Sequence, residues 1–315
     1  MKAMRYHSYG SSDVLVYEEA DRPGAGPGQV VLKVAGTAFN PVDVPIRGGV
    51  LPDVFPVQFP HIPNYDVSGV VAEVGEGVSR WAAGDAVVAF LPMTAPGAAA
   101  EYVAAPAELL AAAPRTVDLV DAAALPSTGL TAWQALFEHA DVRPGQNILV
   151  NGAGGSVGGY AVQLAARFGA TVTATAGGRS RDRVRSYGAD RVVDYGTAPV
   201  LEALAGQRFD AVLHLVLNLA PTAAEETAHL VDGLVADGGV FVSTTTEPPQ
   251  DPGRGVRTAR MDVRSDAGQL AGLVSRVDAG DLRIHVAERR PLTDLPAVHD
   301  LALAGGLAGR TVLTP

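Results

Sequence analysis

The sequence contains no cysteine, and its 24 lysine and arginine residues are outnumbered by 34 aspartate and glutamate residues. Without cysteine the chain forms no disulfide bond and cannot build a zinc site from thiolate ligands. The net charge of −10 at pH 7 weighs against nucleic acid or an anionic membrane as the main partner. Hydrophobic residues make up 47% of the chain, which is enough for a real core and too much for a disordered protein.

Long apolar runs are also missing from the sequence. The amino terminus, MKAMRYHSYG, has no apolar core of the kind that signal peptides carry. No stretch approaches the roughly 20 apolar residues of a membrane span. We therefore expect a cytoplasmic protein without a membrane partner. Its 315 residues leave room for two domains.

The most informative stretch runs from residue 147 to residue 170 and reads NILVNGAGGSVGGYAVQLAARFGA. Its apolar residues 148–150 are typical of a buried strand, and the glycine-rich residues 152–158 follow directly. Apolar side chains then recur at helical spacing up to Gly169, where the helix is expected to end. A strand, a tight glycine turn and a helix in this order are the context that a dinucleotide-binding site requires.

Each part of this turn has an expected role in binding a pyrophosphate group. Gly155 lets the phosphates approach the backbone, and Gly158 lets the helix pack closely against the strand. The free N–H groups and the dipole at the start of the helix favour the negative charge. The residues expected to contact the cofactor here are Gly152, Ala153, Gly155, Ser156, Val157 and Gly158. The alternative is a structural glycine turn in an ordinary α/β domain.

The other segments of the chain show two kinds of pattern. In the first 120 residues, short apolar or alternating segments (30–34, 67–74 and 86–91) are separated by glycine and proline turns, which is typical of an all-β, barrel-like domain. After residue 147, a succession of strands and helices predicts an α/β domain with a doubly wound parallel sheet. The expected strands are 171–175, 190–193, 209–216, 239–244 and, at the end, 310–313; the expected helices are 118–140, 220–234, 267–278 and 295–304.

Motifs along nearly the whole chain occur together in one known family. They are Asn40-Pro41-Val42-Asp43 with Arg47-Gly48, residues 66–71 (DVSGVV), 84–87 (GDAV), 100–103 (AEYV), 125–132 (LPSTGLTA), 152–158 (GAGGSVG) and 309–313 (GRTVL). By these motifs the chain resembles the zinc-free branch of the medium-chain dehydrogenases/reductases, the quinone oxidoreductase or zeta-crystallin-like family. The resemblance implies a GroES-like β-barrel catalytic domain at 1–120 and a Rossmann NADPH-binding domain at 121–263. It also implies a segment at 264–315 that returns to the catalytic domain, and an active-site cleft between the domains.

The resemblance also bears on zinc. Zinc-using relatives hold the metal with Cys, with His or Glu, and with Cys, and the matching places here are Asn40, Tyr65 and Ala124. An amide, a phenol and a methyl group cannot form a zinc site. We therefore expect no metal, and reduction of an already activated, conjugated acceptor rather than oxidation of an alcohol. Such an acceptor needs a positioned hydride and a hydrogen-bond donor for the developing oxyanion.

The type of nicotinamide cofactor is predicted from the end of the second α/β strand, where NAD-binding proteins usually place Asp or Glu for the ribose 2′-hydroxyl. Residues 175–181 read TAGGRSR here, without an acid and with two arginines. A guanidinium binds a 2′-phosphate through charge-assisted hydrogen bonds, so the sequence favours NADPH. The expected contacts are Gly177, Arg179, Arg181 and, by the family resemblance, Tyr195. Arg183 and Arg185 are instead expected on a solvated helix face.

The candidate catalytic residues also come from the resemblance. Asn40 matches a residue that lines the nicotinamide pocket, and Thr128 and Thr131 match positions near the nicotinamide. The structural alternatives are a turn for the asparagine and helix capping or packing for the threonines. Many relatives have a tyrosine where this chain has Pro45, so Tyr65 is the nearest candidate phenol for a hydrogen bond to the substrate.

Two structural alternatives concern the same region. Tyr65 would otherwise fill the place left by the metal. Asp43 and Arg47 are expected to form a structural pair near the cleft rather than to act in catalysis. Asn40, Tyr65 and Thr131 are thus the candidates for sharing the hydrogen bonds to the substrate.

These features together predict an NADPH-dependent reductase that transfers a hydride to a quinone or an α,β-unsaturated carbonyl compound. The alternatives are an enoyl-thioester reductase of polyketide or fatty-acid assembly and a protein that binds NADPH without catalysis. A homodimer is expected, because the family commonly pairs Rossmann domains and the apolar strands 209–216 and 239–244 are expected to leave a sheet edge.

Overall fold

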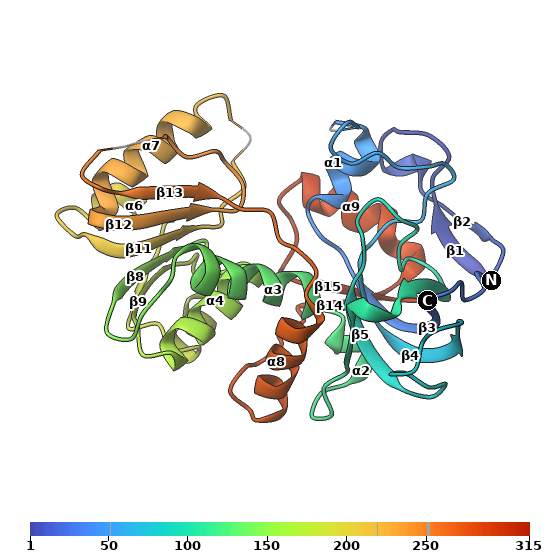
Figure 1. The fold of residues 1–315 in the computed structure, drawn as a ribbon. Helices are drawn as coiled ribbons and strands as arrows, with labels where there is room; N and C mark the ends of the chain where they lie inside the picture. The colour runs from blue at the N-terminus through green and yellow to red at the C-terminus, as the bar shows by residue number, and fades with distance from the viewer. Residues whose placement is uncertain (51, 219, 251–252) are drawn as a thin grey trace. The chain divides into compact units, whose positions relative to one another are not determined.

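A seven-stranded and a six-stranded sheet carry the fold in the computed structural model, which describes residues 1–50, 52–218, 220–250 and 253–315 (Figure 1). The chain divides into two units. The first comprises Met1–Ser127 with Ser265–Pro315, and the second comprises Thr128–Arg264. None of the helices in the described ranges is long and apolar enough to cross a membrane.

The first unit is built on a mostly antiparallel sheet with the strand order β14-β15-β3-β4-β5-β7, and β6 pairs with β3. A two-stranded sheet of β1 and β2 lies at its amino-terminal end. The strands are β1 Lys2–Arg5, β2 Val16–Glu19, β3 Gln29–Ala38, β4 Asp66–Val74, β5 Ala86–Phe90, β6 Tyr102–Pro106, β7 Leu110–Ala112, β14 Glu288–Pro291 and β15 Thr311–Thr314. The helices are α1 Asp43–Gly48, α2 Leu119–Ala122, α8 Ala267–Asp278 and α9 Leu295–Leu303, with short 3₁₀ turns at Ser12–Val14, Ala107–Leu109 and Leu292–Asp294.

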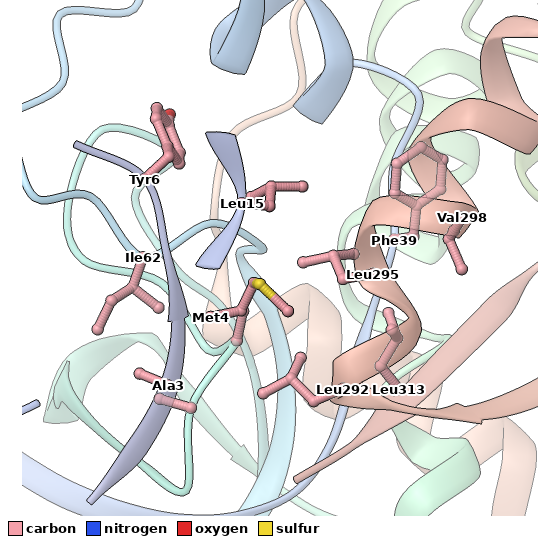
Figure 2. Packing of buried hydrophobic residues seen from close by; sticks show 12 residues of the cluster. Ala3, Met4, Tyr6, Leu15, Phe39, Ile62, Leu292, Leu295, Val298 and Leu313 are labelled. Atoms are coloured by element: carbon pink, nitrogen blue, oxygen red, sulfur yellow. The ribbon is translucent and has the colours of Figure 1, made fainter. Parts of the chain in front are cut away.

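The core of this unit joins residues that are far apart in the sequence (Figure 2). Met4 on β1 packs in one buried cluster with Phe39 and with Leu295 and Val298 on α9. Full burial of such a side chain contributes about 1.5–3 kcal/mol. The carboxyl-terminal α9 and β15 are therefore held to the first strands of the chain by apolar packing.

The second unit contains a six-stranded sheet in which all neighbouring strands are parallel, in the order β10-β9-β8-β11-β12-β13. The strands are β8 Asn147–Asn151, β9 Thr171–Thr175, β10 Arg191–Val193, β11 Phe209–His214, β12 Val235–Ser243 and β13 Arg257–Arg260. The helices are α4 Ser156–Arg167, α5 Arg181–Ser186, α6 Val200–Ala203 and α7 Ala223–Leu234. This order of strands is that of a doubly wound dinucleotide-binding sheet, so the predicted α/β fold is confirmed.

The prediction of one continuous helix at 118–140 is wrong. The segment forms α2, then α3 (Pro126–Gln134), then a π-helical turn at Ala135–His139. Pro126 explains the first break, because proline has no N–H for a helix interior and is suited to a helix start. The proline in the sequence therefore marks the start of α3.

The expectation that strands 209–216 and 239–244 leave a sheet edge is also wrong. In the structure β11 lies between β8 and β12, and β12 lies between β11 and β13. The edge is formed by β13, whose four residues RTAR carry two exposed arginines. Charged side chains on an edge strand oppose pairing with another strand. The homodimer stays a prediction, but these two strands no longer support it.

Candidate active site

The glycine turn lies at the carboxyl end of β8, where residues 152–155 connect the strand to α4. Gly152 has a φ of 99°, a left-handed conformation that favours glycine. Its N–H donates to Thr175 Oγ1 at 2.9 Å, and the Ala153 N–H donates to the Thr175 carbonyl oxygen at 3.0 Å. The end of β9 therefore fixes the backbone at the start of the turn.

Two glycines of the turn have different surroundings. A Cβ atom on Gly158 would lie 2.3 Å from the Gly152 carbonyl oxygen and 2.5 Å from Ala153 Cα, so only glycine permits this close packing of α4. A Cβ atom on Gly155 would meet only the Gly152 carbonyl oxygen, at 3.5 Å. Ser156 begins α4, and the first N–H groups of a helix have no partner within it. This combination of open space and free donors suits an anion such as a pyrophosphate.

Arg183 also supports the turn, contrary to the expectation that it lies on a solvated helix face. Its Nη2 donates to the Gly154 carbonyl oxygen at 3.0 Å, and its side chain is half-buried. The expectation was wrong because α5 packs beside the turn, which the spacing of arginines along one helix does not reveal. Arg185 is exposed, as expected.

The two arginines after β9 differ in their partners. Arg179 is exposed, and in the described part of the chain it has no hydrogen-bond or ion-pair partner. Arg181 Nη2 is paired with Asp194 Oδ2 at 2.8 Å. The hydrogen bond from the Gly196 N–H, and secondarily that from Arg181, lower the pKa of Asp194. Tyr195 is 59% exposed, and its hydroxyl would lie 2.9 Å from a Cβ atom on Gly177. The residues predicted to surround a 2′-phosphate therefore lie in one region, but Asp194 adds an acid that the sequence interpretation did not consider.

A buried polar network forms the centre of the first unit. Arg310 pairs with Asp66 through Nη2, and its Nη1 donates to Asn40 Oδ1 at 2.6 Å. Asn40 Nδ2 donates to Asp66 Oδ2 at 3.0 Å. The N–H and Oγ of Ser127 donate to the two carboxylate oxygens of Asp66 at 2.7 and 2.6 Å. Asp66 is fully buried, and its charge is thus balanced by Arg310 and by three further donors.

The sequence analysis did not predict that these residues interact, although each of them lies in one of the motifs quoted for the family. Asp66 opens a strand whose first five residues include four buried ones, and Arg310 precedes β15, whose Thr311, Val312 and Leu313 are buried. An isolated charge beside a buried strand is a signal for a buried ion pair, since buried charges are found paired. The sequence alone did not show that these two residues, 244 positions apart, meet each other.

The expected pair of Asp43 and Arg47 is not formed in the part of the chain that the structure describes. Asp43 Oδ2 accepts a hydrogen bond from the Asn40 N–H at 2.8 Å. Burial, and secondarily the nearby Asp66 charge, raise the pKa of Asp43 to about 7. Arg47 is buried, its Nε and Nη1 atoms have no hydrogen-bond partner in the segments that the structure describes, and burial lowers its pKa. Asp43 is thus a buried carboxyl group that no cation among the described residues pairs with.

Tyr65 is 6% exposed, and its ring lies against Phe90 with the centroids 5.3 Å apart. Burial raises the pKa of Tyr65 well above its usual value, so the phenol stays protonated at neutral pH. Its hydroxyl makes no hydrogen bond within the described ranges of the chain. A neutral phenol with a free O–H group is able to donate to a substrate oxygen.

The places that match zinc ligands do not fit a zinc ion. The Asn40 amide is committed to Asp66 and Arg310, and the buried Ala124 packs near Ala38 in an alanine-rich cluster. Amide, phenol and methyl groups are not the N, S or carboxylate ligands that zinc takes. Among the described residues, no three histidine, aspartate or glutamate side chains lie together as a metal-binding group.

Thr128 and Thr131 lie one turn apart on α3, and both are buried. Residues three apart on a helix face the same side. The structure therefore places these two threonines on one face of α3, and their role toward a cofactor stays a prediction.

The chain matches known proteins over its whole length. The sequence profile of the alcohol dehydrogenase GroES-like domain matches residues 26–115, and that of the zinc-binding dehydrogenase matches residues 187–313. The chain is 34% identical over 331 residues to a chloroplast envelope quinone oxidoreductase homolog of Arabidopsis thaliana, and the match covers 100% of this chain and 98% of the relative. It is 40% identical over 205 residues to an NADPH-dependent alkenal/one oxidoreductase of the same plant, covering 62% of this chain and 52% of the relative.

Solved structures match the fold of the chain over its whole length. The quinone oxidoreductase from Coxiella burnetii superposes with a TM-score of 0.87 at 27% identity, covering 100% of this chain and 99% of that chain. The GroES-like domain and the Rossmann-type sheet predicted from the sequence are confirmed by these matches. The chain belongs to the quinone oxidoreductase family of the medium-chain dehydrogenase/reductase superfamily and is an oxidoreductase of that family.

Proposed function

We propose that the protein reduces quinones or α,β-unsaturated carbonyl compounds with NADPH and without zinc. The observation that carries the proposal is the glycine turn, which joins an open position at Gly155 to the free N–H groups at the start of α4. The names of the relatives support the substrate class, since one is a quinone oxidoreductase homolog and another an alkenal/one oxidoreductase.

The residues of the second unit fit a dinucleotide cofactor. In this proposal the backbone of Gly152, Ala153, Gly155 and Ser156–Gly158 binds the pyrophosphate, and Thr175 holds the turn in place. When bound, the nicotinamide supplies a hydride, which is the chemistry that no protein side chain provides. The protein binds and orients the cofactor, and it supplies hydrogen bonds and a proton.

The choice of NADPH over NADH is assigned to the residues after β9. Arg179 has a guanidinium that no described residue engages and that is therefore offered to the 2′-phosphate, while Arg181 shares its charge with Asp194. Tyr195 and Gly177 lie next to each other at the same place and would flank the adenosine phosphate. The relative named as NADPH-dependent favours the same choice.

On the substrate side, we assign Tyr65 as the hydrogen-bond donor to the substrate carbonyl, with Asn40 and Thr131 as residues that line the reacting groups. Loss of one oxyanion donor typically costs 10²–10³ in turnover. Tyr65→Phe keeps the ring against Phe90 and removes only the hydroxyl. A turnover within about twofold of the parent would show that Tyr65 only fills space, since even a tenfold change corresponds to about 1.4 kcal/mol.

The function is tested by measuring oxidation of NADPH and of NADH with quinones, enones and enoyl thioesters as acceptors. The proposal expects NADPH-dependent turnover of quinones or enones, and no loss of that turnover after dialysis against a metal chelator. Turnover of enoyl thioesters alone would move the protein to carrier-linked chain assembly. Tight binding of NADPH without turnover of any acceptor would make it a binding protein.

A further inference from the structure

A polar pocket lies in the first unit, close to Asp43 and apart from the glycine turn in the sequence. It is lined by Tyr6, Asp43, His61, Asn64 and Tyr65, together with apolar residues such as Met93. Its empty space, mouth included, is about 250 Å³, of which about 10 Å³ is able to hold the centre of a water molecule. The inner part therefore has room for about one oxygen atom with its hydrogen-bond partners.

Three polar groups of this pocket lack partners. The Tyr6 hydroxyl and both amide atoms of Asn64 are buried and have no hydrogen-bond partner in the described part of the chain. A buried donor or acceptor without a partner destabilises the folded protein unless a ligand or water pairs with it. Asn64 also has a φ of 66°, in the left-handed region that asparagine tolerates at some cost. Unpaired buried polar groups and a strained backbone conformation at one pocket are typical of a binding site. In Figure 2 the Tyr6 oxygen lies at the far end of its ring from the strand that carries Ala3 and Met4.

Among the charged and titratable groups around the pocket, Asp43 is the one that is able to give up a proton near neutral pH. Arg310 is a cation whose charge acts on Asp43, and it is engaged by Asp66 and Asn40. Arg47, on the same helix as Asp43, makes no ion pair with it in the described ranges of the chain. His61 is neutral at pH 7 because burial lowers its pKa to about 4. Burial raises the pKa of Asp43 to about 7, so a protonated carboxyl group is available near neutral pH.

We propose that this pocket binds the carbonyl oxygen of the hydride acceptor and that Asp43 is the acid that protonates this oxygen. The inference rests on the proposed reductase function and adds to it the proton donor and the pocket that holds the carbonyl oxygen. Phenol and amide N–H donors suit a neutral carbonyl oxygen. No unengaged cation among the described residues lines the pocket, and the carboxyl group of Asp43 disfavours an anion beside it, so neutral carbonyl compounds are selected over carboxylates.

The proton step balances with one hydride and one proton. The hydride adds to the carbon conjugated to the carbonyl, and the carbonyl oxygen gains negative charge. The O–H bond of Asp43 breaks, and a new O–H bond forms on that oxygen, giving an enol. From a quinone this enol is a tautomer of the hydroquinone, which forms when the hydride-bearing carbon loses a proton and the second carbonyl oxygen gains one. Asp43 is left as a carboxylate and takes a proton from water before the next turnover. Tyr6, Tyr65 and Asn64 hold the oxygen during this transfer.

The first test compares Asp43→Asn with the parent protein. The amide keeps an oxygen for the Asn40 N–H but has no acidic proton, so kcat should fall at least tenfold, general acids being typically worth 10²–10⁴. The parent's kcat should decline as pH rises through about 7, and this limb should be absent in the variant. The dissociation constant of NADPH should stay within twofold. Glu108→Gln, an exposed carboxylate of the same unit, is the control and should retain the parent's pH profile.

Retention of the falling limb or of the parent's kcat in Asp43→Asn would overturn the assignment. If that variant does not fold, the parent alone decides, because a pH-independent kcat between pH 6 and 8 contradicts the proposal. Absence of NADPH-dependent turnover in the parent would instead remove the proposed function itself. The infrared C=O band of a protonated carboxyl group gives a readout without turnover: it should disappear as pH rises through about 7 and be missing in Asp43→Asn.

The second test replaces Asn64 with glycine, which is comfortable at a φ of 66°. Removing an unpartnered buried amide and the left-handed strain should raise Tm. KM for the acceptor should rise about fivefold for the lost hydrogen bond of about 1 kcal/mol, with kcat changed less. A higher Tm with an unchanged KM would show that the pocket does not bind the acceptor.

Discussion

The Nδ2 atom of Asn151 lies 2.9 Å from Nδ1 of His214, and this contact begins a chain of hydrogen bonds that ends at the glycine turn. Asn151 Oδ1 accepts from Thr175 Oγ1 at 2.7 Å, and Thr175 Oγ1 accepts from the Gly152 N–H at 2.9 Å. Because an amide nitrogen only donates, His214 accepts through Nδ1 and carries its proton on Nε2. Burial lowers the pKa of His214 to about 4, which keeps the ring neutral at neutral pH.

His214→Phe is expected to loosen this chain. The new ring keeps the stacking on Phe241, whose centroid lies 5.8 Å away, but it leaves the Asn151 amide without an acceptor. The free energy of unfolding should fall by about 1–3 kcal/mol, and NADPH should bind severalfold more weakly. Urea unfolding and fluorescence titration with NADPH measure the two effects. His214→Asn places an oxygen near the Nδ1 position and should restore most of both. Equal NADPH affinity in all three proteins would contradict a role in positioning the turn.

Gly155→Val and Gly158→Val should fail in different ways. Gly155 has a φ of −78°, and its Cβ position is 3.5 Å from the nearest atom, so valine should leave the fold intact. Its side chain should nevertheless occupy the space of the pyrophosphate and abolish NADPH binding. Gly158→Val should not fold, because the Cβ atom would lie 2.3 Å from a backbone oxygen. Circular dichroism and NADPH titration separate the two, and normal NADPH binding by Gly155→Val would show that the cofactor lies elsewhere.

The cofactor preference should depend more on Arg179 than on Arg181. Arg179→Ala should weaken NADPH binding by about 1.5–3 kcal/mol, the range for a hydrogen bond to a charged group, and barely change NADH binding. Arg181→Ala should have a smaller effect, because Arg181 is paired with Asp194. Asp194→Asn should release that guanidinium and raise the preference for NADPH. Calorimetric titration with both cofactors gives the ratio of NADPH to NADH affinity for the parent and for each of the three variants. Equal affinity of the parent for NADPH and NADH would refute the assignment.

The sequence predicted the parts of this molecule that depend on local patterns. The strand at 171–175 and the helix at 267–278 match β9 and α8 to the residue, because apolar periodicity and flanking turn residues define them. The site in the first unit depends instead on segments that are distant in the sequence: Asp66 pairs with Arg310, and Tyr6 and Asn64 line the same pocket. The residues that neighbour each of these four in the sequence do not indicate which distant residue it will approach. Edge strands such as β13 were missed for a related reason, since a polar strand at an edge has no apolar pattern.

Arg310→Met should be among the most destabilising single changes in the first unit. Asp66 is fully buried, and removal of its cation leaves a charge that burial makes costly, typically by about 3–5 kcal/mol. Asp66→Asn combined with Arg310→Met removes both charges and should recover part of the lost free energy. Chemical unfolding of the two single variants and the double variant gives the coupling between them. Additive losses in the double variant would mean that the pair is not a coupled unit.

Stability should rise with pH between about pH 4 and 6.5. Burial lowers the pKa of His61 and His214 to about 4 and of His299 to about 3, so over this range the unfolded chain binds protons that the folded chain does not. Their contribution is complete above about pH 6.5 and is lost as pH falls. Asp43 acts in the opposite sense, since its raised pKa of about 7 gives stability that is lost as pH rises toward 7. Three protons against one leave a net slope of up to two protons, at about 1.4 kcal/mol per pH unit for each.

His299→Phe tests this balance. His299 is fully buried with both ring nitrogens unpartnered in the described ranges, and its ring lies 5.0 Å from that of Phe39. Phenylalanine keeps this aromatic contact and removes both the unpaired nitrogens and the titration. Urea unfolding should show equal or higher stability at pH 7, and a slope below pH 6.5 that is smaller by about one proton. The exposed His229, replaced by Gln, is the surface control and should leave the slope as in the parent. An unchanged slope in His299→Phe would mean that His299 is protonated in the folded protein, and its burial would then need a partner for that charge.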